Sequence, residues 1–380
     1  MDWKIPLFKI YWDKEDIKAV EKIIRRGTFW ATGPEINKFE EKIAEFSERK
    51  YCVSFNSGTS ALHSILLAHN VTSGEVIVPS FTFISTSNSV VLAGAKPVFA
   101  EVESKTFGLD IEDVKKRINK KTKVIMPIHY GGMCCRDIKA LKEIAEDKKI
   151  LLIEDAAESI GSKIGNMKAG TFGDAAMFSF CKNKIITTGE GGAIVTNSKE
   201  IYEKLKLIRS HGRVETKIDD YFSTTKEMKY TEVGYNFRMP TMSAALGISQ
   251  LNKIDNIIKM RKEKAEYYNN KLKQLKEVFL PIENEKQKHV YQMYSLKFDK
   301  KTDRNSIQEK LSEKGIMTKV YFYPVHLKKY YKKNFGYNKG DMSKTEELSE
   351  KVLTLPLYPQ ISKEEQEYVA NNIIEYFNKR

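Results

Sequence analysis

Two lysines, Lys182 and Lys184, lie in a short segment bounded by glycines and by two apolar runs. Residues 179–192 read Ser-Phe-Cys-Lys-Asn-Lys-Ile-Ile-Thr-Thr-Gly-Glu-Gly-Gly, and the apolar runs are 175–180 and 193–195. A lysine that is held rigidly and partly out of water has a lowered pKa, so its amine can form a Schiff base with an aldehyde. Lysines two residues apart on an extended segment point the same way, so spacing alone does not choose between them.

A carboxylate at the end of an apolar run adds a second element of such a site. Asp155 follows the run 150–153, and open α/β sheets bind their ligands beyond the carboxyl ends of their strands. A carboxylate there can keep a pyridine nitrogen protonated, as pyridoxal phosphate requires. The alternative interpretation is a carboxylate that caps the next helix.

A Ser-Gly-Thr turn predicts an anion site. Ser57, Gly58 and Thr59 follow the short apolar run 52–55 and open a helical pattern. Backbone N–H groups and hydroxyls at a helix N-terminus bind phosphate well, although Ser and Thr are also ordinary caps there. Phe83 follows another predicted strand and could lie flat on a cofactor ring, whereas packing in the core is the alternative.

The bulk composition indicates a globular enzyme. The chain has 380 residues, of which 41% are hydrophobic and 11% aromatic, so two lobes around a large core are expected. No apolar run reaches the ~20 residues that cross a bilayer, and no signal core follows Met1, so we expect a cytoplasmic protein without membrane contact.

Four cysteines lack metal-ligand spacing, so no metal is expected. The net charge of +14 comes without a nucleic-acid-binding module, and an anionic small substrate would use the same field.

The order of apolar and amphipathic segments along the chain predicts an α/β fold. Short β-rich runs alternate with amphipathic stretches such as 111–118 and 137–146, which indicates a mostly parallel sheet with helices on both faces. A long helix is expected from about residue 242 to 275. We therefore expect a large domain over 1–255, with its first ~30 residues able to pack on the other lobe, and a smaller α+β domain over 256–380. A closing helix is expected at 363–377.

Taken together, these motifs resemble the DegT/DnrJ/StrS sugar-nucleotide aminotransferases, which have the aspartate aminotransferase (fold type I) architecture and use pyridoxal phosphate. The likeness spans nearly the whole chain, through residues 27–34, 56–62, 78–83, 127–131, 154–158, 179–192, 234–239, 323–326 and 355–357.

The resemblance implies a role for each matching residue. Lys184 matches the Schiff-base lysine, and Asp155 the partner of the pyridine nitrogen. Glu158 stands where many members have Gln near the ring hydroxyl. The remaining matches are the phosphate ligands Ser57, Gly58, Thr59 and Ser179, the stacking ring Phe83, Asn236 from the partner subunit of a homodimer, and the substrate-site residues Trp30, Tyr323 and His326.

The resemblance also implies a reaction. The Gly-Glu-Gly-Gly form at 189–192 resembles the branch that acts at sugar C4, and most of all the perosamine synthases, with L-glutamate as amino donor and a nucleotide-linked 4-keto-6-deoxyhexose as acceptor. A UDP- or dTDP-linked acceptor and a 3-aminotransferase remain alternatives. A dehydratase, which has histidine in place of the lysine, and a non-catalytic regulatory protein are more remote ones.

Overall fold

The computed structural model describes residues 3–214, 227–281, 283 and 286–379. Its centre is a seven-stranded sheet of order β1-β9-β8-β5-β4-β2-β3. The pairs β2–β3, β2–β4, β4–β5 and β5–β8 are parallel, and only β9 runs against its neighbours β1 and β8. The expected mostly parallel mixed sheet is therefore confirmed. Its strands are β1 (Tyr51–Phe55), β2 (Glu75–Pro79), β3 (Lys96–Ala100), β4 (Thr122–Ile125), β5 (Leu151–Asp155), β8 (Ala175–Ser179) and β9 (Gly192–Thr196).

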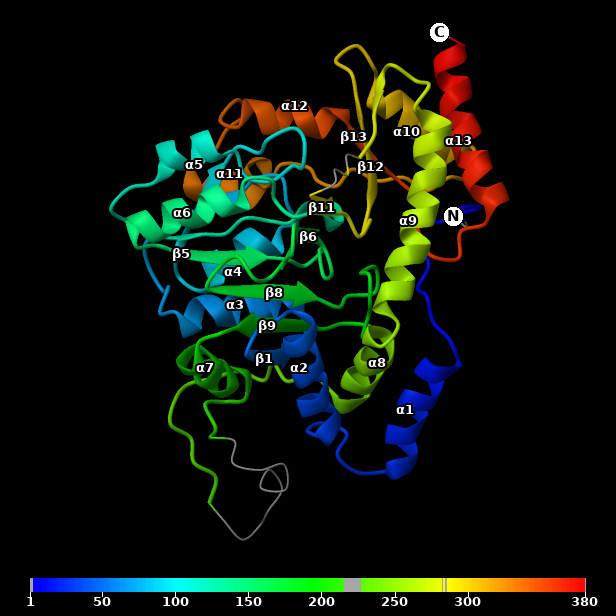
Figure 1. Cartoon of the computed structure of the whole chain (residues 1–380). Helices are drawn as coiled ribbons and strands as arrows, with labels where there is room; N and C mark the ends of the chain where they lie inside the picture. The colour runs from blue at the N-terminus through cyan, green and yellow to red at the C-terminus, as the bar shows by residue number, and fades with distance from the viewer. Residues whose placement is uncertain (1–2, 215–226, 282, 284–285, 380) are drawn as a thin grey trace.

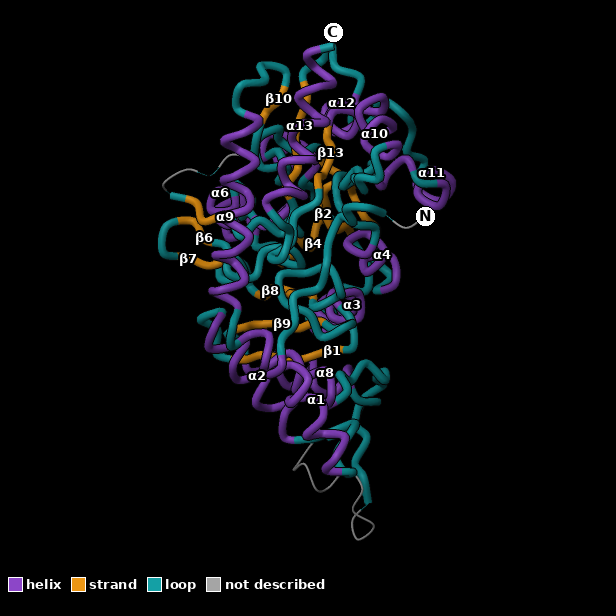
Figure 2. Tube along the Cα trace, turned by 90° about the vertical axis from the view of Figure 1, so that its right-hand side faces the viewer, coloured by secondary structure: helices purple, strands orange, loops and turns teal. Residues whose placement is uncertain are grey.

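Helices cover both faces of this sheet, which is why β8 and β9 are buried along their whole length. Figure 2 shows α3 and α4 on one side of the strands and α6 and α9 on the other. Each face has its own apolar cluster. One face carries α3 (Gly58–Ala68), α4 (Ser85–Leu92) and α7 (Lys199–Arg209), and the other carries α2 (Pro34–Phe46), α5 (Ile111–Arg117), α6 (Ile138–Lys148) and the start of α9 (Ile254–Leu272).

The long helix expected from residue 242 to 275 is two helices, α8 (Thr241–Leu251) and α9. The chain leaves helical geometry at Lys253, whose ammonium bonds to Asp13 and Asp16 at 2.6 and 3.0 Å. The helix α9 then runs from the base of the sheet to the second lobe (Figure 1). It packs Ile257 and Ile258 in the core of the large lobe and its later residues in that of the small one. Within the described residues, no helix combines the length and apolar character needed to cross a bilayer.

The small lobe is an antiparallel sheet with helices packed against it. Its strands have the order β10-β12-β13, and the closing helix α13 is present as expected. Ile5 belongs to the core of this lobe and pairs with Ile316, whereas α1 packs on α8 at the base of the large lobe. The other helices and strands are α1 (Lys14–Arg26), β6 (Lys163–Ile164), β7 (Met167–Lys168), β10 (Val278–Phe279), β11 (Gln287–Lys288), β12 (Tyr294–Phe298), α10 (Arg304–Glu313), α11 (Lys329–Phe335), α12 (Ser343–Lys351), β13 (Val352–Leu355) and α13 (Lys363–Asn378).

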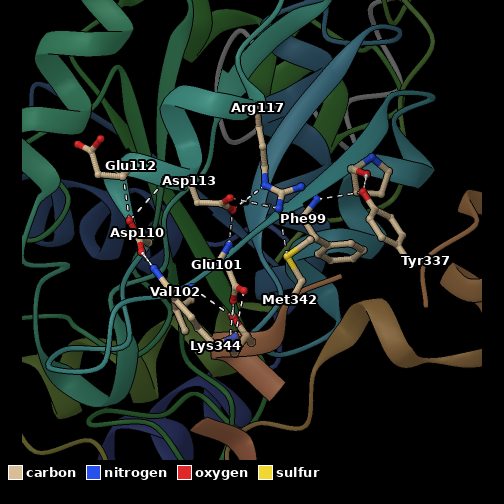
Figure 3. A network of polar contacts seen from close by, with 12 residues as sticks. Phe99, Glu101, Val102, Asp110, Glu112, Asp113, Arg117, Tyr337, Met342 and Lys344 are labelled. Carbon is tan, nitrogen blue, oxygen red and sulfur yellow. Dashed lines mark hydrogen bonds and ion pairs between the residues drawn. The ribbon is translucent and has the colours of Figure 1, made fainter. Parts of the chain in front are cut away.

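The segment that carries α11 and α12 joins the two lobes. Tyr331 and Met342 belong to the core of the large lobe, although they lie late in the chain. At the end of β3, the Glu101 carboxylate accepts hydrogen bonds from the N–H groups of Lys344 (3.1 Å) and Thr345 (2.8 Å) and from the Thr345 hydroxyl. Glu101 therefore caps the N-terminus of α12 from the other lobe, within the network of Figure 3.

Replacing Glu101 by alanine removes this cap and leaves the first turn of α12 without its acceptor. We expect the free energy of unfolding to fall by about 1–3 kcal/mol, measured by urea denaturation. Glu112 is the matched control, since its side chain is 67% exposed and pairs with Lys115 in the same helix. The alanine variant at Glu112 should change stability by less than about 0.5 kcal/mol. Equal effects of the two variants would contradict the role given to Glu101.

Candidate active site

The loop between β8 and β9 holds the two candidate lysines in different environments. The loop is closed by hydrogen bonds from Phe180 N–H to Gly191 C=O and from Thr188 N–H to Phe180 C=O, both 2.9 Å. Lys182 is exposed. The Lys184 side chain is 13% exposed, and its Nζ lies 3.6 Å from Oε1 of the buried Glu158. The geometry therefore turns Lys184 toward the carboxylates and leaves Lys182 on the surface.

Two adjacent carboxylates at the end of β5 have different surroundings, because neighbouring side chains on a strand point to opposite faces. Glu154 accepts hydrogen bonds from the N–H groups of Gly170, Phe172 and Gly173 at 2.7–2.8 Å, and its Oε2 lies 2.8 Å from His129 Nε2. Burial alone raises the pKa of Glu154, but the bonds from His129, Gly173 and Gly170 hold it below the usual 4.5.

Asp155 faces the side on which Lys184 lies. Its Oδ2 accepts from the Thr86 hydroxyl at 2.8 Å, and its Oδ1 from the Ala157 N–H at 3.2 Å. Burial raises the pKa of Asp155, and the Thr86 bond and the Lys184 charge act against this rise. The carboxylate is thus a buried acceptor that a cationic ring nitrogen would stabilise.

Glu158 lies between Lys184 and the loop after β4. The Gly131 N–H donates to its Oε2 at 2.8 Å. Burial raises the pKa of Glu158, and the Lys184 charge opposes the rise. From the small lobe, Tyr321 reaches the same region, where burial and the Glu158 charge raise its pKa to about 12 and its hydroxyl bonds to the Asn183 side chain.

The predicted phosphate ligands come together at the start of α3. Ser57 caps the helix through a 3.1 Å bond from the Ser60 N–H, and the first turn of α3 contains no acidic residue. Gly58 lies so close to β8 that an added Cβ would be 3.2 Å from Ser179 Cβ. A Cβ on Gly192 would be 2.5 Å from the Ser57 carbonyl oxygen. The N-terminus of α3 and the hydroxyls of Ser57 and Ser179 thus meet where added side chains at Gly58 and Gly192 would crowd the backbone. This arrangement is a cradle suited to a phosphate.

Phe83, Tyr323 and His326, which are also predicted for the site, differ in their exposure and contacts. Phe83 is 58% exposed at the turn before α4, with its ring 6.4 Å from that of Phe322. Tyr323 is exposed near Arg304 and Lys328. His326 is wholly buried, with Nδ1 2.6 Å from the Ser80 hydroxyl and Nε2 3.1 Å from Glu346. In this conformation His326 therefore joins the lobes instead of lining an open site, and its contact with substrate stays a prediction.

Trp30 and Asn236 lie outside the cluster around Lys184. The Trp30 indole donates to the carbonyl of Ile23, and the residue is 47% exposed. Asn236 is exposed, and its carbonyl lies 3.5 Å from the side-chain amide of Asn56, next to the phosphate turn. Neither side chain reaches Lys184 within one chain, so both assignments stay predictions that depend on a second copy.

Several residues of the site carried no signal of their own in the sequence. Thr86 and Tyr321 are ordinary residue types near longer motifs, and His129 lies within the matching motif 127–131, which assigned it no role. Thr86 follows Phe83 by one helical turn, so the start of a helix after a strand was the only available hint.

The assembled residues fit pyridoxal phosphate. The cradle at Ser57 suits its phosphate, the acceptor at Asp155 its ring nitrogen, the exposed ring of Phe83 its face, and the amine of Lys184 its aldehyde. Within the described residues, no group of three His, Cys, Asp or Glu side chains is arranged to hold a metal. Fold and site together are those of a pyridoxal-phosphate-dependent aminotransferase.

Comparison with known proteins gives the family. Residues 11–374 match the model of the DegT/DnrJ/EryC1/StrS aminotransferase family, and the chain belongs to it. A GDP-perosamine synthase of Vibrio cholerae is 35% identical over 381 residues, which cover 98% of this chain and 99% of that protein. A UDP-4-amino-4-deoxy-L-arabinose–oxoglutarate aminotransferase of Shewanella sediminis is 31% identical, with 98% and 97% covered. A Streptococcus pneumoniae structure described as a sugar aminotransferase in its PLP form matches with a TM-score of 0.91 at 25% identity, with 99% of each chain covered.

The buried carboxylate of Glu154 predicts a pH-dependent contribution to stability. Because its folded pKa lies below the unfolded value, the contribution is complete above about pH 4.5 and is lost as the pH falls through the folded pKa. We expect Glu154→Gln to lower the free energy of unfolding by about 3 kcal/mol at pH 7. The difference from the parent protein should shrink below pH 4.5, as measured by urea denaturation across pH. The exposed Glu146, changed to Gln, is the control. A pH-independent difference would contradict the assignment.

Proposed function

We propose that this protein transfers the amino group of L-glutamate to C4 of a nucleotide-linked 4-keto-6-deoxyhexose, and that the acceptor is GDP-4-keto-6-deoxymannose, which becomes GDP-perosamine. The observation that carries the proposal is the largely buried Lys184 side chain, 3.6 Å from Glu158 and on the same side of the sheet as Asp155. The similarity to a GDP-perosamine synthase over nearly the whole chain supports the choice of acceptor. A cytoplasmic location fits such a substrate.

Each residue of the site has a defined task in this reaction. When bound, pyridoxal phosphate supplies an aldehyde that carries the amino group and a ring that delocalises negative charge. Lys184 removes the proton from the α-carbon of glutamate and delivers a proton to C4 of the sugar. Asp155 keeps the ring nitrogen protonated, and Glu158 holds the Lys184 ammonium between proton transfers. Ser57, Gly58, Thr59 and Ser179 fix the phosphate, and Phe83 covers the ring.

A UDP-linked 4-keto sugar is the second candidate acceptor, because an enzyme named for a UDP-linked amino sugar is also similar over the full chain. The chemistry at Lys184 is the same for both nucleotides, so the residues around the reacting atoms do not distinguish them. The Gly-Glu-Gly-Gly segment at 189–192 supports C4 over C3 as the position of transfer.

We infer that the working unit is a homodimer in which each chain completes the site of the other. Loop 27–33 and the segment that leads to Thr241 lie together, since Thr241 N–H donates to the Trp30 carbonyl and Gly33 N–H to the Thr241 hydroxyl. Phe29, Trp30, Val233 and Tyr235 are exposed on these segments. Exposed apolar groups of this kind are typical of an interface. Such an interface would bring Asn236 to the cofactor phosphate in the partner subunit and Trp30 to the substrate there.

The choice of acceptor can be measured directly. The protein is loaded with its amino-carrying cofactor, and single turnovers are followed with GDP-, UDP- and dTDP-linked 4-keto-6-deoxy sugars. We expect the GDP-linked sugar to react at least about tenfold faster than the others, which corresponds to about 1.4 kcal/mol of discrimination. Lys184→Ala should abolish turnover and Lys182→Ala should retain it. Faster reaction with a UDP- or dTDP-linked sugar would overturn the GDP assignment, and an active Lys184→Ala variant would overturn the reaction.

Mixed dimers test the shared site. Lys184→Ala and Asn236→Ala chains are each expected to be impaired alone. If Asn236 acts across the interface, a mixed dimer contains one site with both residues intact, so about half of the parent activity per mixed dimer should return. If Asn236 serves its own chain, both sites of the mixed dimer are damaged and no activity returns. Sedimentation of the mixture confirms that dimers are present.

A further inference from the structure

The buried carboxylate of Asp155 depends on a threonine that the reaction described above does not use. Its Oδ2 accepts from Thr86 Oγ1 at 2.8 Å, and its Oδ1 accepts from the Ala157 N–H at the longer distance of 3.2 Å. Asp155 is 3% exposed and Thr86 is fully buried. Water therefore does not replace the Thr86 hydroxyl at this carboxylate if it is removed.

A second threonine fixes the direction of that hydrogen bond. Thr82 Oγ1 lies 2.8 Å from Thr86 Oγ1, and Thr82 is also buried. A hydroxyl has one proton to donate. Since the Thr86 proton is directed to Asp155, Thr82 must be the donor in the bond between the two threonines. The chain Thr82 to Thr86 to Asp155 thus delivers a hydroxyl donor to the carboxylate, and Thr82 adjoins Phe83, the ring proposed to cover the cofactor.

We propose that Thr86 is a positioning residue, which holds the Asp155 carboxylate in place for the cofactor's ring nitrogen, with Thr82 orienting the Thr86 hydroxyl. This inference rests on the proposed function, because it takes Asp155 as the partner of that nitrogen. The contact between Asp155 and the ring nitrogen then depends on two uncharged side chains, Thr82 and Thr86, which lie between β2 and β3. Thr86 reaches Asp155 at the end of β5 only in the folded molecule.

The charges around Asp155 show what the threonine adds. Lys184 and His129 favour the ionised form of Asp155, and Glu158 is a further carboxylate in the same region. With a cofactor attached, the Lys184 nitrogen would be held at the cofactor's aldehyde carbon, and His129 is directed to Glu154. The Thr86 hydroxyl and the Ala157 N–H are then the direct donors to the carboxylate in this structure.

The test compares Thr86→Val, which keeps the shape and removes the hydroxyl, with Thr86→Ser, which keeps the hydroxyl. The dissociation constant of pyridoxal phosphate is measured for each apoprotein by titration of the visible absorbance. The same titration is made with the deaza analogue, in which carbon replaces the ring nitrogen. We expect Thr86→Val to bind pyridoxal phosphate about tenfold more weakly and Thr86→Ser within about twofold of the parent. Thr82→Val should show a smaller loss in the same direction.

The analogue separates positioning from general damage to the fold. Without a ring nitrogen the Asp155 contact is absent, so Thr86→Val should bind the deaza analogue within about twofold of the parent. Equal weakening for both ligands, or unchanged affinity for pyridoxal phosphate in Thr86→Val, would overturn the role of Thr86. Failure of the parent protein to bind pyridoxal phosphate would instead overturn the proposed function, so the two failures are distinguishable.

Discussion

The buried carboxylate of Glu154 is the interaction on which the site depends. It gathers three backbone N–H groups from residues 170–173 and the His129 imidazole around the end of β5. His129 Nδ1 in turn accepts from the Cys135 N–H, so the loop after β4 is fixed to the same point. The backbone of the next residue, Asp155, bonds to Pro127 and His129 on that loop. A charge that faces the core thus holds the strand end in place, and its neighbour faces the site.

The two lobes meet around the lysine loop, and the small lobe contributes to it directly. The Gln292 amide donates to the Asn183 carbonyl, and the Tyr130 hydroxyl bonds to the Tyr321 carbonyl. The caps and buried pairs at Glu101 and His326 hold the segment around α11 and α12 against the large lobe. Contacts from both lobes therefore position the loop that carries Lys184, and the family match over residues 11–374 likewise spans both lobes.

Much of this architecture could be predicted from local pattern. The strands of the sheet are short apolar runs followed by polar residues, and that alternation determines a parallel sheet with its ligands at one edge. The local pattern does not reveal the break between α8 and α9, at which Lys253 pairs with Asp13 and Asp16 from the start of the chain. Nor does the local pattern reveal that Tyr331 and Met342, in a lysine-rich stretch, join the core of the large lobe. Thr86 is a third case, because its partner Asp155 is 69 residues away. Contacts over such separations leave no local pattern.

The central claim is that Lys184, and not its neighbour Lys182, carries the cofactor. Sodium borohydride reduces a lysine-bound cofactor to a stable adduct, and peptide mass spectrometry then locates it. The protein loaded with pyridoxal phosphate should carry one adduct per chain, on Lys184. An adduct on Lys182, or no adduct on either lysine in protein that has bound the cofactor, would contradict the account.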